Sequence, residues 1–149
     1  MEIRALDAQS SPETLAALIA LAHCLAVHEA RSAPSPAISP EALRAMSFAA
    51  TRDGLGARVP FDGAMVPVPN AAVLALALVG HEAVELGCWD ELMLVQRILE
   101  RGNGADRQRA VAARAGLRGT LAFLVADTMG GSRPGRFERR ASHLAEVSA

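Results

Sequence analysis

The first eight residues are the feature that most restricts the fold, because they predict a β-strand in a sequence that otherwise predicts helices. Polar and apolar residues alternate from Met1 through Leu6, which is the period of a half-buried strand. One strand cannot pair its own backbone N–H and C=O groups, and the sequence predicts only a weak hairpin besides it. We therefore expect a partner chain to supply the rest of an antiparallel sheet.

Helix start and stop signals divide most of the remaining sequence. Ser-Ser-Pro at residues 10–12 and Ser-Pro at residues 39–40 are typical of helix N-termini, and Asn70 is the expected cap of a third helix. Asp-Gly at residues 62–63, between two proline-containing segments, predicts a weak β-hairpin. The predicted helices cover residues 12–30, 40–52, 70–87, 90–101, 105–115 and 117–128. The expected fold class is α+β and mostly helical, with the N-terminal strand and the hairpin completing the partner's sheet.

The sequence predicts one domain over residues 1–129, followed by an Arg-rich mobile tail over residues 130–149. With 51% hydrophobic and 3% aromatic residues, the core must be aliphatic. The longest apolar stretch, residues 71–79, is shorter than the roughly 20 residues of a membrane span, which predicts a soluble protein. Cys24 and Cys88 lie in apolar helical contexts, so we expect a cytoplasmic protein with reduced thiols.

The charge composition restricts the partners and the chemistry. Fifteen basic residues against sixteen acidic ones give a net charge of -1, which predicts neither nucleic-acid nor membrane-surface binding. Every basic residue other than His is Arg, because the sequence contains no Lys. Lysine Schiff bases and P-loop lysines are therefore excluded, and phosphate or carboxylate binding falls to Arg. No His-x-x-x-His or Cys-x-x-Cys pair predicts a zinc site.

Glu2 and Arg4 form the first candidate site, since alternation along a strand places both on one face. A carboxylate binds hard divalent cations, and a guanidinium binds phosphate through two parallel hydrogen bonds. The same spacing is common in surface charge pairs on half-exposed strands. The spacing alone leaves both interpretations open.

Two stretches of the sequence resemble a known family. The run EIRALDAQ at residues 2–9, followed by an Ala/Leu-rich helix, is similar to the strand-then-helix segment of bacterial carboxylate-amine ligases, the relatives of glutamate-cysteine ligase. The runs ELGCWDEL at residues 85–92 and RILERGNGADRQR at residues 97–109 resemble the C-terminal helical region of that family, in the same order. The resemblance covers residues 2–129 and only the C-terminal half of the family.

The resemblance implies a reaction and roles for three residues. In that family ATP phosphorylates a substrate carboxylate, an amine then displaces phosphate from the acyl phosphate to form an amide, and Mg²⁺ bridges the nucleotide phosphates. Carried over to this chain, Glu2 would be a metal ligand, and Arg4 would be the catalytic contact to the ATP phosphates or the transferring phosphoryl group. Asp7 would help to bind substrate, and capping of the turn before the first helix is its alternative role.

Two further arginines are candidate contacts to the nucleotide. Arg52 lies in a stretch that aligns with an Asn-Arg-Trp-Arg motif and a following Arg-x-Gly-Leu motif of the family. Arg107 follows Gly-Asn-Gly at residues 102–104, near a helix N-terminus that favours anions, and a solvated first turn is the alternative. In the aligned stretch, Arg52, Gly54 and Leu55 match the family, whereas Met46, Ser47 and Ala49 replace polar or cationic positions.

We therefore expect this chain to be one subunit of a split ATP-dependent carboxylate-amine ligase. A separate N-terminal-half polypeptide would complete it as a heteromer, and a small-molecule acid and amine would be its substrates. One alternative is a catalytically silent binding or regulatory module derived from the same family, motivated by the replaced motif positions. Another is a homo-oligomer that builds a sheet from its own strands.

Overall fold

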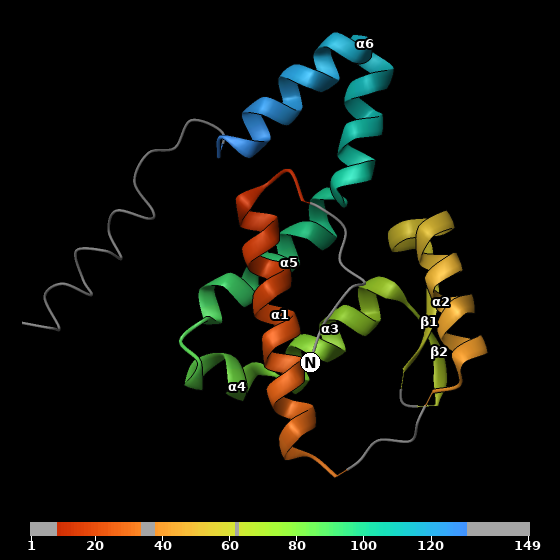
Figure 1. Cartoon of the computed structure of the whole chain (residues 1–149), viewed down its shortest axis with the longest axis vertical. Helices are drawn as coiled ribbons and strands as arrows, with labels where there is room; N and C mark the ends of the chain where they lie inside the picture. The colour runs from red at the N-terminus through yellow and green to blue at the C-terminus, as the bar shows by residue number, and fades with distance from the viewer. Residues whose placement is uncertain (1–8, 34–37, 62, 131–149) are drawn as a thin grey trace, which may run out of the picture.

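The computed structural model describes residues 9–33, 38–61 and 63–130, in which helices predominate and the two strands form one short hairpin (Figure 1). The predicted N-terminal strand and most of the predicted tail lie outside the described residues. The elements are α1 (Pro12–Arg31), α2 (Pro40–Asp53), the 3-10 turn η1 (Gly54–Gly56), β1 (Arg58–Phe61), β2 (Ala64–Pro67), α3 (Val68–Leu78), α4 (Gly80–Glu85), α5 (Trp89–Arg101) and α6 (Gly104–Thr128).

The two predicted Ser-Pro helix starts are confirmed. The Ser11 side chain accepts a hydrogen bond from the backbone N–H of Thr14 at 3.3 Å, and the Ser39 side chain does the same for Ala42 at 3.2 Å. Each serine side chain accepts a hydrogen bond from a backbone N–H group that has no acceptor within the helix. The proline that follows each serine has no backbone N–H, and at the first helical position this costs no intrahelical hydrogen bond. The hairpin is confirmed as well: β1 and β2 are antiparallel, with Val59 opposite Val66.

The third predicted helix is wrong in its start and in its length. It begins at Val68 rather than after Asn70, because the chain passes directly from β2 into the helix and Val68 N–H donates to the Ala57 carbonyl at 2.9 Å. It also ends early: Val79, with φ −103° and ψ 12°, separates α3 from α4. Gly80 follows this break, and a Cβ there would make ordinary van der Waals contact with the Trp89 ring at 3.4 Å.

The core lies where α1 packs along α5, with α4 against both helices and α3 against α5 and α4 (Figure 1). Helix α1 contributes small side chains on one face, which allow the helices to approach closely. The buried core residues are Ala17, Ala20, Cys24, Leu76, Val79, Ala83, Leu92, Leu94 and Val95. None is aromatic, as the composition predicts.

Helix α1 is long and apolar enough to cross a membrane by length and composition alone, with a mean hydropathy of 1.3 over its most apolar window. Its buried face, however, packs against α5 in the core. A mostly buried core helix and a signal sequence near the N-terminus pass the same test, and 17% of this window is buried.

The remaining elements expose large apolar side chains. Neither α2 nor α6 has a buried residue. Phe48 on α2 is 65% exposed, and Leu117 on α6 is 75% exposed. Exposed apolar surface of this kind marks contacts that the described part of the chain does not make by itself.

Candidate functional site

Helix α6 consists of two arms joined at Gly116 (Figure 1). Gly116 adopts φ 60° and ψ −164°, a conformation that is almost restricted to glycine. This is the boundary between the predicted helices at residues 105–115 and 117–128. The first arm begins with a capping box: Asn103 Oδ1 accepts from Asp106 N–H at 2.9 Å, and Asp106 Oδ2 accepts from Asn103 N–H at 3.2 Å.

Arg107 on the first arm contacts Asp127 on the second. Its Nη1 donates to Asp127 Oδ1 at 2.9 Å and its Nη2 donates to Oδ2 at 3.3 Å. The guanidinium also lies 5.6 Å from the centre of the Phe123 ring. Ser10 Oγ, immediately before the cap of α1, donates to Asp127 Oδ2 at 2.7 Å. Asp127 therefore holds both the bend of α6 and the attachment of its second arm to the start of α1.

A cleft of about 540 Å³ opens between the start of α1, the end of α5 and both arms of α6. Its cationic groups are Arg97 and Arg101 from α5 and Arg107 from α6. A second hollow of about 440 Å³ shares Arg101, Arg107 and Phe123 with this cleft and adds Arg114. Residues 97–118 contain six arginines against two acidic residues, in a chain whose net charge is -1. The positive charge of the chain is therefore concentrated beside this cleft.

The three cleft arginines differ in how far protein groups neutralise them. The Arg107 guanidinium forms an ion pair with the Asp127 carboxylate. Arg97 faces Glu13 at 3.9 Å, which is too long for a hydrogen bond. Among the described residues Arg101 has no hydrogen-bond or ion-pair partner, and its side chain is exposed. Within the described part of the chain, an anion entering the cleft would meet the unpaired guanidinium of Arg101 and the loosely paired guanidinium of Arg97.

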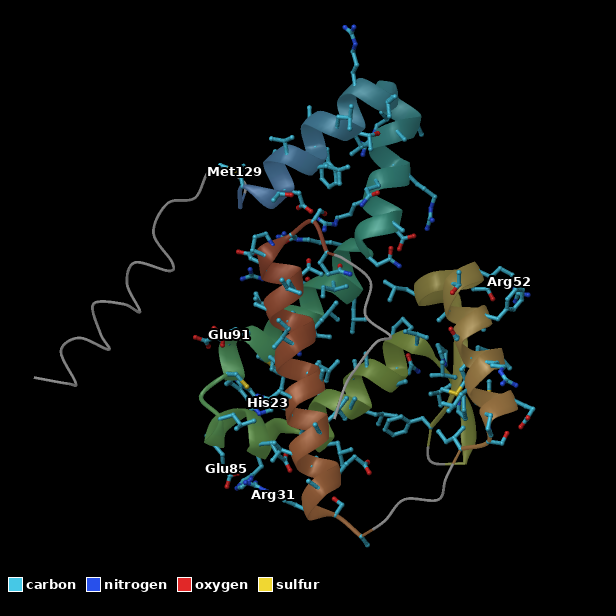
Figure 2. All side chains as sticks on the ribbon, in the orientation of Figure 1. His23, Arg31, Arg52, Glu85, Glu91 and Met129 are labelled. Carbon is cyan, nitrogen blue, oxygen red and sulfur yellow. The ribbon has the colours of Figure 1, made fainter. Side chains whose placement is uncertain are left out.

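The sequence-predicted site residues are only partly brought together. Arg107 lines the cleft, whereas Arg52 lies on α2 beside the hairpin, away from the end of α6 at Met129 (Figure 2). Arg52 donates to Asp53 through Nε at 2.8 Å and Nη2 at 2.6 Å, and this exposed contact holds the pKa of Asp53 below its ordinary value. Glu2, Arg4 and Asp7 lie outside the described residues.

Sequence reasoning missed Arg97 and Arg101 as site residues. The signal was present in their spacing, because residues four apart on a helix project from the same face. Their position at the end of α5 brings that face to the cleft. What the spacing could not show was the bend of α6, which closes the cleft from the other side.

A second polar cluster lies in the core, away from the cleft lining. Glu82 on α4 is only 7% exposed and accepts a hydrogen bond from His28 Nδ1–H on α1 at 2.9 Å. This hydrogen bond and one from the backbone hold the pKa of Glu82 below its ordinary value, although burial acts in the opposite direction. The other oxygen, Oε2, is buried without a partner in the described structure. At the outer edge of this cluster Arg31 donates to Glu85 (Figure 2).

The described residues do not contain a metal centre. Among them no three or more His, Cys, Asp or Glu side chains are grouped so that they could hold a metal ion. The arginines and the helix N-termini at the cleft suit an anion instead.

Comparison with known proteins gives one family. The family model described as Glutamate-cysteine ligase family 2 matches residues 1–132. A protein of Rubrobacter xylanophilus named "Putative glutamate--cysteine ligase 2-3" is 40% identical in an alignment of 133 positions, which covers 86% of this chain and 35% of the relative. A protein of Corynebacterium glutamicum named "Putative glutamate--cysteine ligase 2" is 37% identical in an alignment of 119 positions, which covers 74% of this chain and 31% of the relative.

A third relative, from Corynebacterium efficiens and named "Putative glutamate--cysteine ligase 2-1", is 34% identical in an alignment of 142 positions, which covers 90% of this chain and 37% of the relative. The chain thus spans about a third of the length of the curated relatives that it matches. No solved structure matches it with significance.

Proposed function

Because this chain belongs to glutamate-cysteine ligase family 2, we propose that it is one subunit of a split ATP-dependent carboxylate-amine ligase. A second polypeptide, carrying the part of the family that this chain does not span, completes the enzyme. The names of the relatives make glutamate and cysteine the first acid and amine to test. The cytoplasm, where ATP is abundant, is the proposed location.

The observation that carries this proposal is the cleft with Arg101 left without a protein partner among the described residues. An unpaired guanidinium offers a planar set of N–H donors that matches phosphate or carboxylate oxygens. Arg97, 3.9 Å from Glu13, can turn toward the same anion without losing a hydrogen bond. The start of α1 adds the partial positive charge of a helix N-terminus.

The exposed apolar surface supports the need for a second polypeptide. Leu117, Leu121, Val125 and Met129 recur every four residues along the second arm of α6, and each is more than half exposed. Residues at this spacing form one stripe on a helix. The stripe lies on the face of the arm opposite Phe123 and Asp127, which line the cleft, and a stripe of this length is suited to contact with a partner.

In the proposed reaction, a carboxylate oxygen of the acid attacks the γ-phosphorus of ATP, and ADP leaves. The amine nitrogen then attacks the carbonyl carbon of the acyl phosphate, and inorganic phosphate leaves as the amide forms. Arg101 and Arg97 would donate hydrogen bonds to phosphoryl oxygens, where negative charge accumulates in the transition state. Arg107, held by Asp127, would position the arm that forms the wall of the cleft.

Mg²⁺, when bound, would neutralise charge on the nucleotide phosphates. The described residues do not fit it, because they hold no cluster of three or more possible ligands. The proposal therefore assigns Mg²⁺ to no described residue. Glu2 stays the proposed ligand from this chain, and Arg4 stays the proposed phosphate contact. Arg4 is six positions before Ser10, whose side chain donates to Asp127.

The experiment is co-purification of this chain with a candidate polypeptide that carries the rest of the family and is encoded by the neighbouring open reading frame, followed by measurement of ADP release with ATP, glutamate and cysteine. The proposal predicts ADP release by the pair well above the sum of the two separate polypeptides. An ADP signal from the pair no greater than that sum would reject it.

The replaced motif positions favour one second candidate, a catalytically silent binding module. Ser47 and Ala49 on α2 lack the charge of the corresponding family positions. Glu2→Gln and Arg4→Ala separate the two candidates. A ligase subunit should lose turnover by about 10²-fold in each variant, as is common when a charge-stabilising group is removed. A silent module should bind its partner equally well with either substitution.

A further inference from the structure

Cys24 and Cys88 bring their sulfur atoms together from two distant parts of the chain. Their Sγ atoms lie 3.6 Å apart, and both thiols are free. Cys24 is in the middle of α1 and is fully buried, whereas Cys88 is half-buried at the cap position of α5. The separation is close to van der Waals contact, and about 1.6 Å of movement would bring it to the length of a disulfide.

The backbone around Cys88 can supply that movement. Cys88 lies in the short connection between α4 and α5, where the preceding Gly87 has φ 65°. Both backbone groups of Cys88 are hydrogen-bonded, the N–H to the Ala83 carbonyl and the carbonyl to Leu92 N–H, each at 2.9 Å, so Cys88 moves together with this connection. Cys24, by contrast, is fixed by the packing of α1 against α5. Closure would therefore be achieved by a shift of the connection towards α1.

We propose that Cys24 and Cys88 are a modification site, an intramolecular dithiol that low-molecular-weight disulfides oxidise to a disulfide. This site is separate from the arginine cleft, because neither cysteine lines it. The bond would join the middle of α1 to the start of α5, and these two helices both form part of the cleft.

The order of attack follows from exposure. The Cys88 sulfur attacks one sulfur of the small disulfide, and the first small thiol leaves with the Cys88 proton. The Cys24 sulfur then attacks the Cys88 sulfur of the mixed disulfide, and the second small thiol leaves with the Cys24 proton. Two electrons pass from the two protein thiols to the small disulfide, which becomes two thiols.

The environment of Cys24 supports its role as the second sulfur. Burial, the hydrogen bond to Cys88 and the nearby charges of Cys88 and Glu82 raise the pKa of the Cys24 thiol to about 11. Cys24 therefore keeps its proton at neutral pH and is a poor first nucleophile. Once Cys88 carries the leaving group, the short distance compensates for the low thiolate fraction of Cys24.

The test is to incubate the full native chain with oxidised glutathione and to measure intact mass and a non-reduced peptide map. The proposal predicts a loss of about 2 Da, one cross-linked peptide containing both cysteines, and reversal by dithiothreitol. In Cys24→Ala the reaction should stop at a glutathione adduct on Cys88. In Cys88→Ala, adduct formation should be at least about 10-fold slower than in Cys24→Ala, because only the buried thiol is left.

A second measurement does not depend on the folding of the variants. In buffers of defined ratio of reduced to oxidised glutathione, the equilibrium constant for closing the bond should be at least about 10²-fold larger in the native chain than in the chain unfolded by urea. Closure that is no more favourable in the native chain, adducts on both cysteines without a cross-link, or disulfides only between chains would each overturn the proposal.

Discussion

The Arg107 guanidinium and the Asp127 carboxylate form a two-point contact across the bend of α6, with N–O distances of 2.9 and 3.3 Å. The Asp127 side chain is 13% exposed and also accepts from Ser10, so the contact is partly shielded from water. Since the same residues line the arginine cleft, the shape of the cleft depends on this pair.

Asp127→Asn should loosen the second arm of α6. An amide cannot accept two hydrogen bonds from Arg107 and carries no charge, so we expect the free energy of unfolding to fall by about 1–2 kcal/mol. Hydrogen exchange over residues 117–128 should become faster. The matched control is Asp53→Asn, which removes an exposed arginine contact and should leave exchange in α6 unchanged. Equal exchange in both variants would show that the pair does not hold the arm.

Gly116→Ala should strain the bend. At φ 60° and ψ −164° a side chain costs about 1–3 kcal/mol, so the variant should unfold at lower urea concentration. The control is Gly56→Ala, since a Cβ there meets nothing within 4 Å and the backbone is not left-handed. If the two substitutions lower stability equally, the bend is not the source of the strain.

The pH dependence of stability should report the His28–Glu82 contact. The pKa of Glu82 is lower in the folded chain than its ordinary value, so unfolding takes up a proton between the two values. The contribution of Glu82 to the free energy of unfolding is therefore complete above the ordinary pKa of Glu. This contribution is lost as the pH falls through the lower pKa that Glu82 has in the folded chain. Urea unfolding from pH 7 to pH 3 should show that Glu82→Gln reduces proton uptake by up to about one proton. Identical pH profiles for the variant and the original chain would contradict this account.

Arg101→Ala should reduce catalysis by the assembled pair without weakening the fold, because the Arg101 side chain is exposed and has no partner among the described residues. Loss of a phosphate contact predicts a fall in the rate of ADP release of about 10²-fold. Arg118→Ala is the matched control, since Arg118 is an exposed arginine of α6 outside both hollows. A rate in Arg101→Ala equal to that in Arg118→Ala would remove Arg101 from the proposed site.

The local parts of the fold could be predicted from the sequence because their causes are local. The serine caps at Ser11 and Ser39 act on donors three residues away, and a glycine conformation alone sets the break at Gly116. The start of α3 could not be predicted in this way. There the hydrogen bond from Val68 to the Ala57 carbonyl, between residues on either side of the hairpin, sets the helix start before Asn70.

The arrangement of the candidate site depends on tertiary contacts even more than the helix boundaries do, so less of it could be predicted from the sequence. Arg107 could be singled out from its helix start, but its partner Asp127 is 20 residues away and reaches it only because α6 bends. Arg52 was a candidate because it matches a position of the family motif, yet its helix, α2, lies away from the cleft. Sequence spacing places residues on a common helix face, whereas the bend and the helix packing decide which faces meet.

The central claim is that this chain and a second polypeptide together activate a carboxylate with ATP. Its most direct test supplies the pair with ATP, cysteine and glutamate labelled with ¹⁸O in its carboxylates, and measures the mass of the inorganic phosphate released. An acyl phosphate transfers one carboxylate oxygen to phosphate, so the account predicts singly labelled phosphate from the two polypeptides together and none from either alone. Unlabelled phosphate from an active pair would contradict it.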